Sequence, residues 1–437
     1  MKIPFRELRG LWASTTLCKV FQGVSGILAP AEFPKGQPPR QPPFDRRSCA
    51  PIGCRNGSNM AEPEQSNPES GASAAASELA RLRERIDAVD RIILEQLNQR
   101  AKWVLEVGRL KHSRGASVYE EVREKRIVSS LVESNSGPFP NDGLAPVFRE
   151  IISATRSLEE GLSIAYMGPE GTFSHEAANL KFGRLAVLEP VPSIGDVFAA
   201  VERGTVSLGI VPVENTTEGV VTQVLDAFVD SDVLICGEVL LRISNHLASR
   251  SGRIEEIRQV ASNPQPLAQC RRWLDCNLPG VERLETVSTT AAAQLAAQDG
   301  SIAAICSASA VEGNGLRTIE ASIEDRRDNT TRFLVIGKQI PEPTGNDLTS
   351  AVFTIRKDEP GGLHRLLQPF ADEEINLTSI QLRPIRGKPW EYLFFLDLEG
   401  HCRESRVERA LSIVANIAHS HRMLGSFPRA DVERGRS

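Results

Sequence analysis

The sequence predicts a multidomain chain with three kinds of fold: an all-α domain, a two-lobed α/β domain and a smaller α+β domain. The chain has 437 residues, which at roughly 100–200 residues per domain corresponds to two to four domains. A long stretch with apolar residues every three or four positions comes before short β-rich runs that alternate with helical ones. A β-α-β-β-α-β pattern closes the chain.

Composition and charge exclude several classes of protein. Hydrophobic residues at 41% and charged residues at 24% are globular values, and no apolar run approaches the roughly 18 residues that span a bilayer. Residues 1–59 carry nine Lys or Arg against three Asp or Glu, a charge of +6, so the rest of the chain carries −11 of the total of −5. A net negative charge disfavours binding to the negatively charged phosphates of nucleic acid, so we do not expect a nucleic-acid-binding protein.

The basic head, residues 1–59, and the linker that follows it are expected to lack a folded core up to residue 76. Seven prolines fall within residues 30–51, and Gly, Ser, Ala and Glu dominate from Pro63 to Ser77. Neither stretch has the apolar periodicity that a core requires. Three interpretations of the head stay open: translated sequence upstream of a true start at Met60, a transit peptide, or a functional tail.

The cysteines show neither CxxC nor Cys/His zinc spacing. They are Cys18, Cys49, Cys54, Cys236, Cys270, Cys276, Cys306 and Cys402. Scattered cysteines of this kind indicate a reducing compartment without a disulfide frame. We therefore expect a cytoplasmic protein with no metal and no cofactor.

From Ser77 to about Lys111 the apolar spacing of three or four predicts one long helix. At 1.5 Å per residue, roughly 35 residues make a rod of about 50 Å. Two shorter helices, expected at about 119–133 and 144–160, cover such a rod only in part. We therefore expect at least a homodimer in which the long helices pack together.

Cationic residues recur on these predicted helices among acidic neighbours: Arg83, Arg100, Lys111 and Arg123. Taken singly, each is more often part of a solvated charged face. The ordered string LRERIDAVD, EVGRLK, VREKR and FREIISATRSLE over residues 77–160 resembles the all-helical chorismate mutase domain. The resemblance implies that these cations hold the two carboxylates and the ether oxygen of chorismate, the first of them in the partner's site.

The same resemblance places Glu124, Thr155 and Glu159 in the mutase pocket. The rearrangement needs no acid, base or nucleophile, because fixed charges that hold a compact dianion suffice. Arg100, Lys111 and Glu159 are the catalytic residues that we expect in this site. A charged Glu159 would repel the charge that develops on the ether oxygen, so we hypothesise that it acts protonated and that mutase activity weakens as pH rises.

Residues 162–338 alternate twice between short β-rich and helical runs, which predicts two α/β lobes with a ligand in the cleft between them. Four motifs fall at strand ends: GPEGTFSHE, PVENTTEG, SNPQPLAQCR and DNTTRFLVIG. The first, taken alone, fits an ordinary turn with a helix cap equally well. Together and in this order they resemble prephenate dehydratase. The resemblance implies a periplasmic-binding-protein-like pair of lobes and the loss of CO2 and hydroxide from prephenate to give phenylpyruvate.

The dehydratase resemblance also assigns the residues of the second site. We expect Thr331 to be the hydroxyl donor at the leaving group, acting through position and hydrogen bonding because an unperturbed Thr is a poor acid. Arg332 either supplies charge to a carboxylate or is a buried structural partner. His175, Cys270 and Cys306 are expected to be structural. The other expected pocket residues are Thr172, Ser174, Glu214, Asn215, Ser262, Gln265, Gln269, Ser288 and Asn329.

Residues 348–427 follow a β-α-β-β-α-β pattern, which predicts a ferredoxin-like unit. GGLHRLLQPF followed by INLTSIQLRP resembles the ACT domain attached to these dehydratases, which implies inhibition by phenylalanine bound at a subunit interface. Gln381 and Leu382 replace a Glu-Ser pair of the family, which weakens the expected grip on the effector's ammonium group. The expected effector residues are Gly361, Gly362, Leu363, Asn376, Leu377, Thr378 and Arg383.

Together the resemblances imply a bifunctional enzyme of phenylalanine biosynthesis with domains at residues 77–160, 162–338 and 348–427. Chorismate and prephenate are the expected substrates and L-phenylalanine the expected effector, with neither nucleic acid nor membrane as a partner. Two alternatives stay open. The helical mutase domain argues against an arogenate dehydratase, and Thr331 together with the ordered cations argues against a non-catalytic amino-acid sensor.

Overall fold

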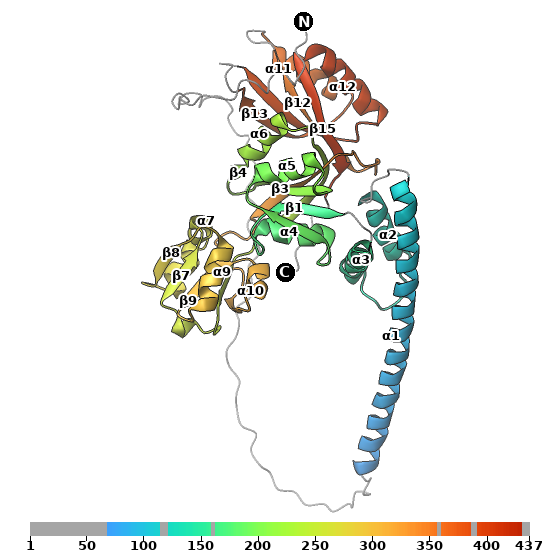
Figure 1. Ribbon diagram of the computed structural model, residues 1–437, viewed down its shortest axis with the longest axis vertical. Coiled ribbons are helices and arrows are strands. Elements are labelled where there is room, and N and C mark those ends of the chain that lie inside the picture. Colours follow the sequence, from blue (N-terminus) through green and yellow to red (C-terminus); the bar gives the residue numbers. More distant parts are fainter. Residues whose placement is uncertain (1–67, 114–120, 159–161, 356–359, 386–390, 431–437) are drawn as a thin grey trace, which may run out of the picture. The chain divides into compact units, whose positions relative to one another are not determined.

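The computed structural model describes residues 68–113, 121–158, 162–355, 360–385 and 391–430 (Figure 1). The described chain falls into two units, one of residues 68–94 and one that starts at Glu95. The basic head lies outside the described residues, so its three interpretations stay predictions.

Three helices open the described chain: α1 (Pro68–Ser113), α2 (Glu121–Ser134) and α3 (Asn141–Arg156). One long helix followed by two shorter ones confirms the prediction. The expected end of the linker at residue 76 is wrong, because α1 already begins at Pro68. Residues 68–76 are rich in Ala and Ser with one Glu, and a helix that has formed further along the chain extends into good helix formers at little cost.

Helix α3 docks onto the dehydratase-like region through its last turn. Arg156 Nη2 donates a hydrogen bond of 2.8 Å to the carbonyl of Phe182, and its Nη1 pairs with Glu124 Oε1 at 2.6 Å. Gly183 permits this approach: it has a φ of +81°, and a Cβ there would lie 2.4 Å from Cβ of Ser153. The side chain of Arg156 therefore joins two helices to the lobe beside them.

The first lobe is built on a mixed sheet with the strand order β2-β1-β3-β11-β5. Strand β1 runs parallel to β2 and β3, whereas β11 runs antiparallel to both β3 and β5. Because β11 returns to this sheet after the second lobe, the DNTTRF motif lies beside the PVENTTEG motif. The elements are β1 (Ser163–Met167), α4 (Phe173–Phe182), β2 (Val187–Val191), α5 (Ile194–Arg203), β3 (Leu208–Asn215), β4 (Gly219–Val220), α6 (Thr222–Asp230), β5 (Leu234–Arg242) and β11 (Thr330–Gly337).

The second lobe has its own five-stranded sheet in the order β10-β6-β9-β7-β8. Its elements are β6 (His246–Ser249), η2 (Ile254–Glu256), β7 (Gln259–Ser262), α7 (Pro264–Gln269), α8 (Arg271–Asn277), β8 (Glu282–Glu285), α9 (Thr289–Gln298), β9 (Ile302–Cys306), α10 (Ala308–Gly313) and β10 (Arg317–Glu320). Two separate sheets with their own helices confirm the two-lobed prediction.

The C-terminal domain, residues 347–430, follows the predicted β-α-β-β-α-β order. Its elements are β12 (Asp347–Thr354), α11 (Gly362–Asp372), β13 (Leu377–Pro384), β14 (Tyr392–Glu399), α12 (Ser405–Ile417) and β15 (Ser420–Pro428). The strands lie antiparallel in the order β13-β14-β12-β15, which confirms the ferredoxin-like arrangement.

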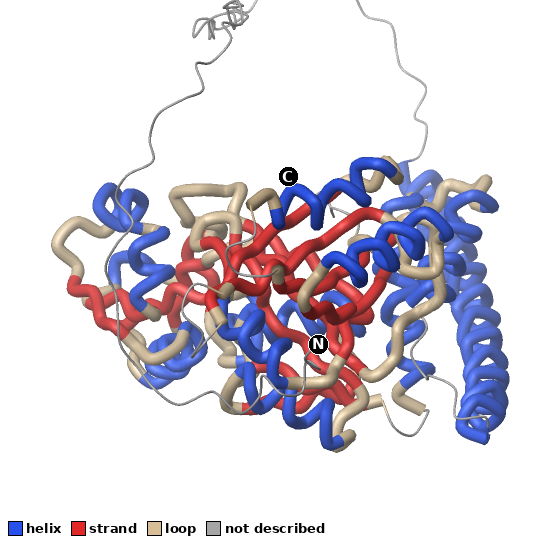
Figure 2. Tube along the Cα trace, turned by 90° about the horizontal axis from the view of Figure 1, so that it is seen from above, coloured by secondary structure: helices blue, strands red, loops and turns tan. Residues whose placement is uncertain are grey.

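The sheets of the first lobe and the C-terminal domain join into one ten-stranded sheet, whose strands are flanked by helices (Figure 2). The join is a parallel pairing of Gly425 on β15 with Ile235 on β5. A Cβ at Gly425 would lie 2.1 Å from the Ile235 carbonyl oxygen, so only glycine fits. One apolar cluster spans both parts and includes Phe228 of α6 and Phe395 of β14. None of the described helices has the length and apolar character of a membrane span.

Candidate functional site

Thr331 lies at the beginning of β11 and faces Asn215 at the end of β3. Thr331 is only 8% exposed, and Nδ2 of Asn215 donates a hydrogen bond of 2.8 Å to its Oγ1. The two residues are 116 positions apart in the sequence. The antiparallel pairing of β3 and β11 therefore brings the DNTTRF and PVENTTEG motifs together.

Three donors fix the orientation of the Asn215 amide. Its Oδ1 accepts from the backbone N–H of Thr217 at 2.9 Å, from the Thr217 hydroxyl at 2.6 Å and from the backbone N–H of Glu218 at 3.1 Å. Backbone N–H groups can only donate, so Oδ1 must face them and Nδ2 must face Thr331. Thr331 Oγ1 thus accepts from the protein, which leaves its own hydrogen for a ligand.

A cavity of about 240 Å³ adjoins this network. Thr217 connects the network to this cavity, because it lines the cavity and its Oγ1 lies 2.9 Å from Oδ1 of Asn329, another lining residue. The cavity approaches the smallest size of small-molecule sites. Its lining includes two of the predicted residues, Gln269 and Asn329. The full lining is Thr217, Ala268, Gln269, Arg272, Glu324, Asp325, Arg326 and Asn329.

Gln269 links the two lobes at this cavity. Its Nε2 donates to Glu218 Oε1 of the first lobe at 3.3 Å, and its Oε1 accepts from Nδ2 of Asn245 at 3.4 Å. Asn245 and Glu324 are buried beneath it, and the backbone N–H of Asn245 donates to Glu324 Oε2 at 2.9 Å. Polar side chains of both lobes therefore meet at this cavity, and a ligand bound between the lobes stays a prediction.

Two arginines of the lining, Arg272 and Arg326, were missed by the sequence analysis. Both are exposed at the cavity, and in a sequence such residues look like part of a solvated surface. They add two positive charges to a lining that also holds the carboxylates of Glu324 and Asp325. The only feature of the sequence that could have pointed to them is that each belongs to a pair of arginines, Arg271–Arg272 on α8 and Arg326–Arg327 before Asn329.

Two of the predicted pocket residues cap helices. Thr172 Oγ1 accepts from the backbone N–H of His175 at 3.3 Å, and Ser288 Oγ accepts from that of Ala291 at 3.0 Å. Nδ1 of the His175 ring accepts a hydrogen bond of 3.2 Å from the N–H of Gly171, which supports the structural role expected for this residue. Burial lowers the pKa of His175, and the charge of Glu170 offsets this only in part.

Three further predicted residues lie in the same motifs with different exposure. Ser262 is fully buried and its Oγ donates 2.7 Å to the carbonyl of Ile305. Ser174 is buried, whereas Gln265 is exposed. Contact of these hydroxyls and amides with substrate stays a prediction.

Cys270 and Cys306 are buried in apolar clusters, as predicted for small packing residues. Both are 0% exposed. Burial raises the pKa of the Cys306 thiol to about 12, so this thiol stays protonated at neutral pH. Nucleophilic chemistry by a thiolate is therefore not expected from it.

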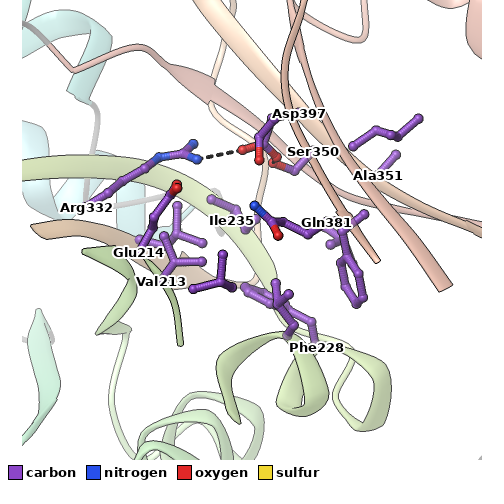
Figure 3. Close-up of a pocket in the computed structure, with 16 residues that line it drawn as sticks. Val213, Glu214, Phe228, Ile235, Arg332, Ser350, Ala351, Gln381 and Asp397 are labelled. Carbon is purple, nitrogen blue, oxygen red and sulfur yellow. Dashed lines mark hydrogen bonds and ion pairs between the residues drawn. The ribbon is translucent and has the colours of Figure 1, made fainter. Parts of the chain in front are cut away.

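Glu214 and Arg332 lie on the face of the β3–β11 strand pair opposite to Thr331. They are register partners, and both line a smaller cavity toward the C-terminal domain (Figure 3). Arg332 Nε lies 2.7 Å from Glu238 Oε2 and Nη1 lies 2.6 Å from Asp397 Oδ2. Of the two roles considered for Arg332, the pairing favours the buried structural partner. Both side chains point away from Thr331, because successive residues of a strand face opposite sides.

In the helical region the structure brings Arg100, Arg123, Glu124 and Thr155 close together. Nη1 of Arg100 donates a hydrogen bond of 2.5 Å to Oγ1 of Thr155. Burial lowers the pKa of Arg100, while the charge of Glu124 raises it and that of Arg123 lowers it. Arg123 is exposed. This cluster is cationic, as expected of a site for a dianion.

The remaining mutase residues are only partly described. Arg83 lies on α1 within the unit of residues 68–94. Lys111 lies near the end of α1, with its side chain outside the described parts, and Glu159 lies wholly outside the described residues. Their predicted roles stay predictions.

The predicted effector residues lie on or next to α11 and β13 of the C-terminal domain. Gly362 begins α11, and Leu377, Thr378 and Arg383 lie on β13, with Leu363 and Asn376 beside them. Arg383 forms a forked ion pair with Asp226 of the first lobe, with Nη2 lying 2.8 Å from each carboxylate oxygen. This arginine therefore ties the C-terminal domain to the first lobe, and its contact with an effector stays a prediction.

No group of three or more His, Cys, Asp or Glu side chains could hold an ion among the residues that the structure describes.

Comparisons with known proteins match each of the three regions. The prephenate dehydratase model matches residues 164–341, the chorismate mutase type II model matches residues 82–160, and the ACT domain model matches residues 350–416. The regions predicted from the sequence overlap all three matches.

Curated relatives match most of the chain. It is 44% identical over 357 residues to the bifunctional chorismate mutase/prephenate dehydratase of Aquifex aeolicus, a match that covers 81% of this chain and 98% of the relative. It is 42% identical over 361 residues to the enzyme of the same name from Stutzerimonas stutzeri, with 81% and 99% coverage. Among solved structures, prephenate dehydratase from Arthrobacter aurescens in complex with L-Phe has a TM-score of 0.57 and 33% identity, covering 62% of this chain and 91% of that one.

Proposed function

The chain belongs to the family of bifunctional chorismate mutase/prephenate dehydratases, and we propose from its geometry which residues carry out each reaction. The enzyme rearranges chorismate to prephenate and then converts prephenate to phenylpyruvate. The observation that carries the assignment of the second site is the Asn215–Thr331 hydrogen bond, in which Thr331 Oγ1 accepts, so its own hydrogen remains available to donate to a substrate.

In the dehydratase reaction Thr331 donates a hydrogen bond to the ring hydroxyl as it leaves. The C–C bond to the ring carboxylate breaks, its electron pair completes the aromatic ring, and CO2 and hydroxide depart. Asn215 holds Thr331 in position throughout, so the donor needs no reorganisation when charge develops on the leaving oxygen. Aromatisation supplies the driving force.

We assign the substrate's carboxylates to the cavity beside this pair. Gln269 and Asn329 offer hydrogen bonds, and Arg272 and Arg326 offer positive charge. Charge-assisted hydrogen bonds from a guanidinium to a carboxylate are among the stronger polar contacts. The side chains on both lobes would then close around one dianion.

In the mutase reaction Arg100 and Arg123 hold chorismate next to Thr155, with Lys111, Glu124 and Glu159 completing the site. The reaction makes and breaks bonds only within the substrate, so fixed charges are sufficient. Because Glu159 is proposed to act protonated, activity should fall as pH rises through its pKa. A mutase rate that stays constant up to about pH 9 would contradict this role.

A second copy of the chain completes the mutase site in this proposal, with Arg83 supplied by the partner. The part of α1 before Glu95 exposes a row of apolar side chains in the single chain. They are Leu79, Leu82, Ile86, Val89, Ile92 and Ile93, each close to half exposed. Burial of this row against a second copy would remove large apolar side chains from water. From the cysteine usage we place the enzyme in the cytoplasm.

L-phenylalanine is the proposed effector, and the C-terminal domain is its proposed site. Support comes from the ACT match over residues 350–416 and from the L-Phe complex of the Arthrobacter aurescens enzyme. Binding at millimolar concentration by calorimetry is the expected result, and no heat at that concentration would remove the assignment.

Purified protein supplied with chorismate tests the whole proposal. We expect chorismate to disappear and phenylpyruvate to accumulate, with prephenate as a transient species. Prephenate that accumulates without phenylpyruvate would show a mutase without a dehydratase. Arogenate added as a competing substrate separates a prephenate enzyme from an arogenate enzyme, and an inactive chain that binds phenylalanine would identify a sensor.

A further inference from the structure

The first residues of β11 contact different partners on the two faces of the sheet. Thr331 and Arg332 are successive residues of an extended strand, so their side chains point to opposite faces of the sheet. Thr331 meets Asn215 in the candidate dehydratase site, whereas Arg332 meets Asp397 on β14 of the C-terminal domain. The proposed hydroxyl donor and a contact with the regulatory domain are thus adjacent in sequence.

Arg332 is held between two carboxylates that come from different domains. Glu238 belongs to β5 of the first lobe, and Asp397 belongs to the C-terminal domain. The side chains of Arg332, Glu238 and Asp397 are 17%, 4% and 17% exposed, so water screens their charges poorly. Burial alone lowers the pKa of Arg332, but the charges and hydrogen bonds of Asp397 and Glu238 raise it above its ordinary value. Removal of one partner from such a cluster leaves a buried charge uncompensated.

Asp397 is in turn connected to β13, the strand with predicted effector residues. Ser379 on β13 is the register partner of Asp397, and Thr378 Oγ1 donates a hydrogen bond of 3.3 Å to the Asp397 carbonyl. The Asp397 carboxylate also accepts a short hydrogen bond from Ser350 on β12. A displacement of β13 therefore acts on Asp397 through direct contacts.

Arg332 also borders the small cavity between the catalytic sheet and the C-terminal domain, together with Glu214 and Gln381 (Figure 3). The cavity volume is about 30 Å³, which is room for roughly one or two water molecules. Nη2 of Arg332 is buried and has no hydrogen-bond partner among the described residues. The guanidinium therefore has a spare donor and some space in which to change partners.

We infer that Arg332 is a positioning residue of the dehydratase reaction, anchored by Asp397, and that effector binding reaches Thr331 by loosening this anchor. The inference rests on the proposed function, because it takes Thr331 as the hydroxyl donor and β13 as the effector strand. Arg332 touches no reacting atom in this scheme. It holds β11 so that Thr331 and Asn215 stay in register.

The test is an Asp397→Asn variant of the full-length chain. Asparagine keeps the shape of the side chain and can still bond Ser350, but it removes the charge that faces Arg332. We expect dehydratase kcat to fall about tenfold with little change in KM for prephenate, because binding groups are untouched. The variant already resembles the inhibited state, so the ratio of activities without and with saturating phenylalanine should shrink about tenfold.

Mutase activity of the same preparation is the internal control and should be unchanged. Glu373→Gln is the matched control variant: it removes a carboxylate of the same domain that pairs with Arg409 at 2.6 Å, and it should keep wild-type kcat and inhibition. Arg332→Lys keeps the charge but loses the forked geometry that two carboxylates require, so it should reproduce the loss seen with Asp397→Asn. If Asp397→Asn fails to fold, the kinetics of Arg332→Lys test the inference in its place.

A folded Asp397→Asn enzyme with wild-type kcat and a wild-type inhibition ratio would overturn the inference. An equal loss in Glu373→Gln would also overturn it, since the effect would then be general to the domain. Wild-type protein without dehydratase activity would overturn the proposed function instead, so the two failures are distinguishable.

Discussion

The two faces of the β3–β11 strand pair make different kinds of contact. On one face, Thr331 and Asn215 share a neutral hydrogen bond of 2.8 Å near a cavity of about 240 Å³. On the other face, Arg332 pairs with Glu238 at 2.7 Å and Asp397 at 2.6 Å beside a cavity of about 30 Å³. A neutral hydroxyl can be shared with a substrate without breaking its own partner's bond, whereas a paired charge is suited to holding position. Successive residues of one strand thus carry the proposed hydroxyl donor and the proposed positioning residue on opposite faces.

The largest expected effect comes from Thr331→Val, which removes the hydroxyl and keeps the shape. We expect dehydratase kcat to fall about a thousandfold, because a positioned proton donor contributes on the order of 10²–10⁴ to rate. Steady-state kinetics with prephenate measure it. Thr330→Val makes the same change one residue earlier, on the other face, and should stay within about threefold of wild type. Equal losses in the two variants would break the comparison.

The next effect tests the partner of Thr331. Asn215→Asp is isosteric but turns the Nδ2 donor into an acceptor, so the Thr331 hydroxyl should donate to the carboxylate instead of the substrate. We expect kcat to fall about a hundredfold with little change in KM. The double variant Asn215→Asp/Thr331→Val should have the same kcat as Thr331→Val alone, because Asn215 acts through Thr331. Additive losses would show that Asn215 has an independent role.

A smaller effect is expected at the rim of the larger cavity. Arg272→Gln and Arg326→Gln should each raise KM for prephenate about tenfold and leave kcat nearly unchanged, since they remove charge that binds the substrate and its transition state alike. Arg271→Gln is the matched control, because its guanidinium faces Asp275 instead of the cavity. A raised KM in Arg271→Gln, but not in Arg272→Gln or Arg326→Gln, would contradict the assignment of the substrate's carboxylates to this cavity.

The smallest effect concerns stability alone. Glu176 on α4 has a buried Oε2 with no hydrogen-bond partner among the described residues, and burial raises its pKa to about 7. A raised pKa means that the folded protein favours the protonated acid. The contribution of Glu176 to the free energy of unfolding is therefore present at low pH and is lost as pH rises from about 4.5 to about 7. Glu176→Gln should therefore be more stable than wild type at pH 8, by on the order of 1–3 kcal/mol, and equal to it near pH 4.

Thermal unfolding of Glu176→Gln at the two pH values provides the measurement. Glu189→Gln on β2, an exposed position of the same lobe, should follow wild type at both. A constant difference between wild type and Glu176→Gln at pH 4 and pH 8 would contradict the assignment of the raised pKa to this carboxyl.

Sequence patterns predicted the fold well where the signal was local. The spacing of apolar residues predicted α1, and alternating short runs predicted both lobes and the C-terminal domain. The prediction was wrong at the start of α1, since a tract rich in Ala and Ser suits either a linker or the extension of a helix. The joining of two sheets at Gly425 and Ile235 had no local signal, because it depends on one backbone approach between distant segments.

Sequence patterns predicted the site in the same uneven way. Thr331, Asn215, Gln269 and Asn329 were assigned because four polar motifs at strand ends, in this order, resemble those of prephenate dehydratase. The pairing of Arg332 with Asp397 joins residues 65 positions apart, and no spacing rule connects such residues. Glu214 was expected in the pocket from the dehydratase resemblance; it is the register partner of Arg332 and lines the smaller cavity, on the face of the strand pair opposite to Thr331.

The join between β5 and β15 matters for engineering an enzyme that phenylalanine no longer inhibits. Deletion of the C-terminal domain is the obvious design, but β15 covers one edge of β5 through the Gly425–Ile235 pairing. Ile235, Val239 and Leu241 of β5 are at most 6% exposed in the intact chain. A truncated chain would present β5 as a free apolar edge, which favours aggregation between molecules. A point substitution in the C-terminal domain keeps this edge covered and so avoids the exposure that a deletion would cause.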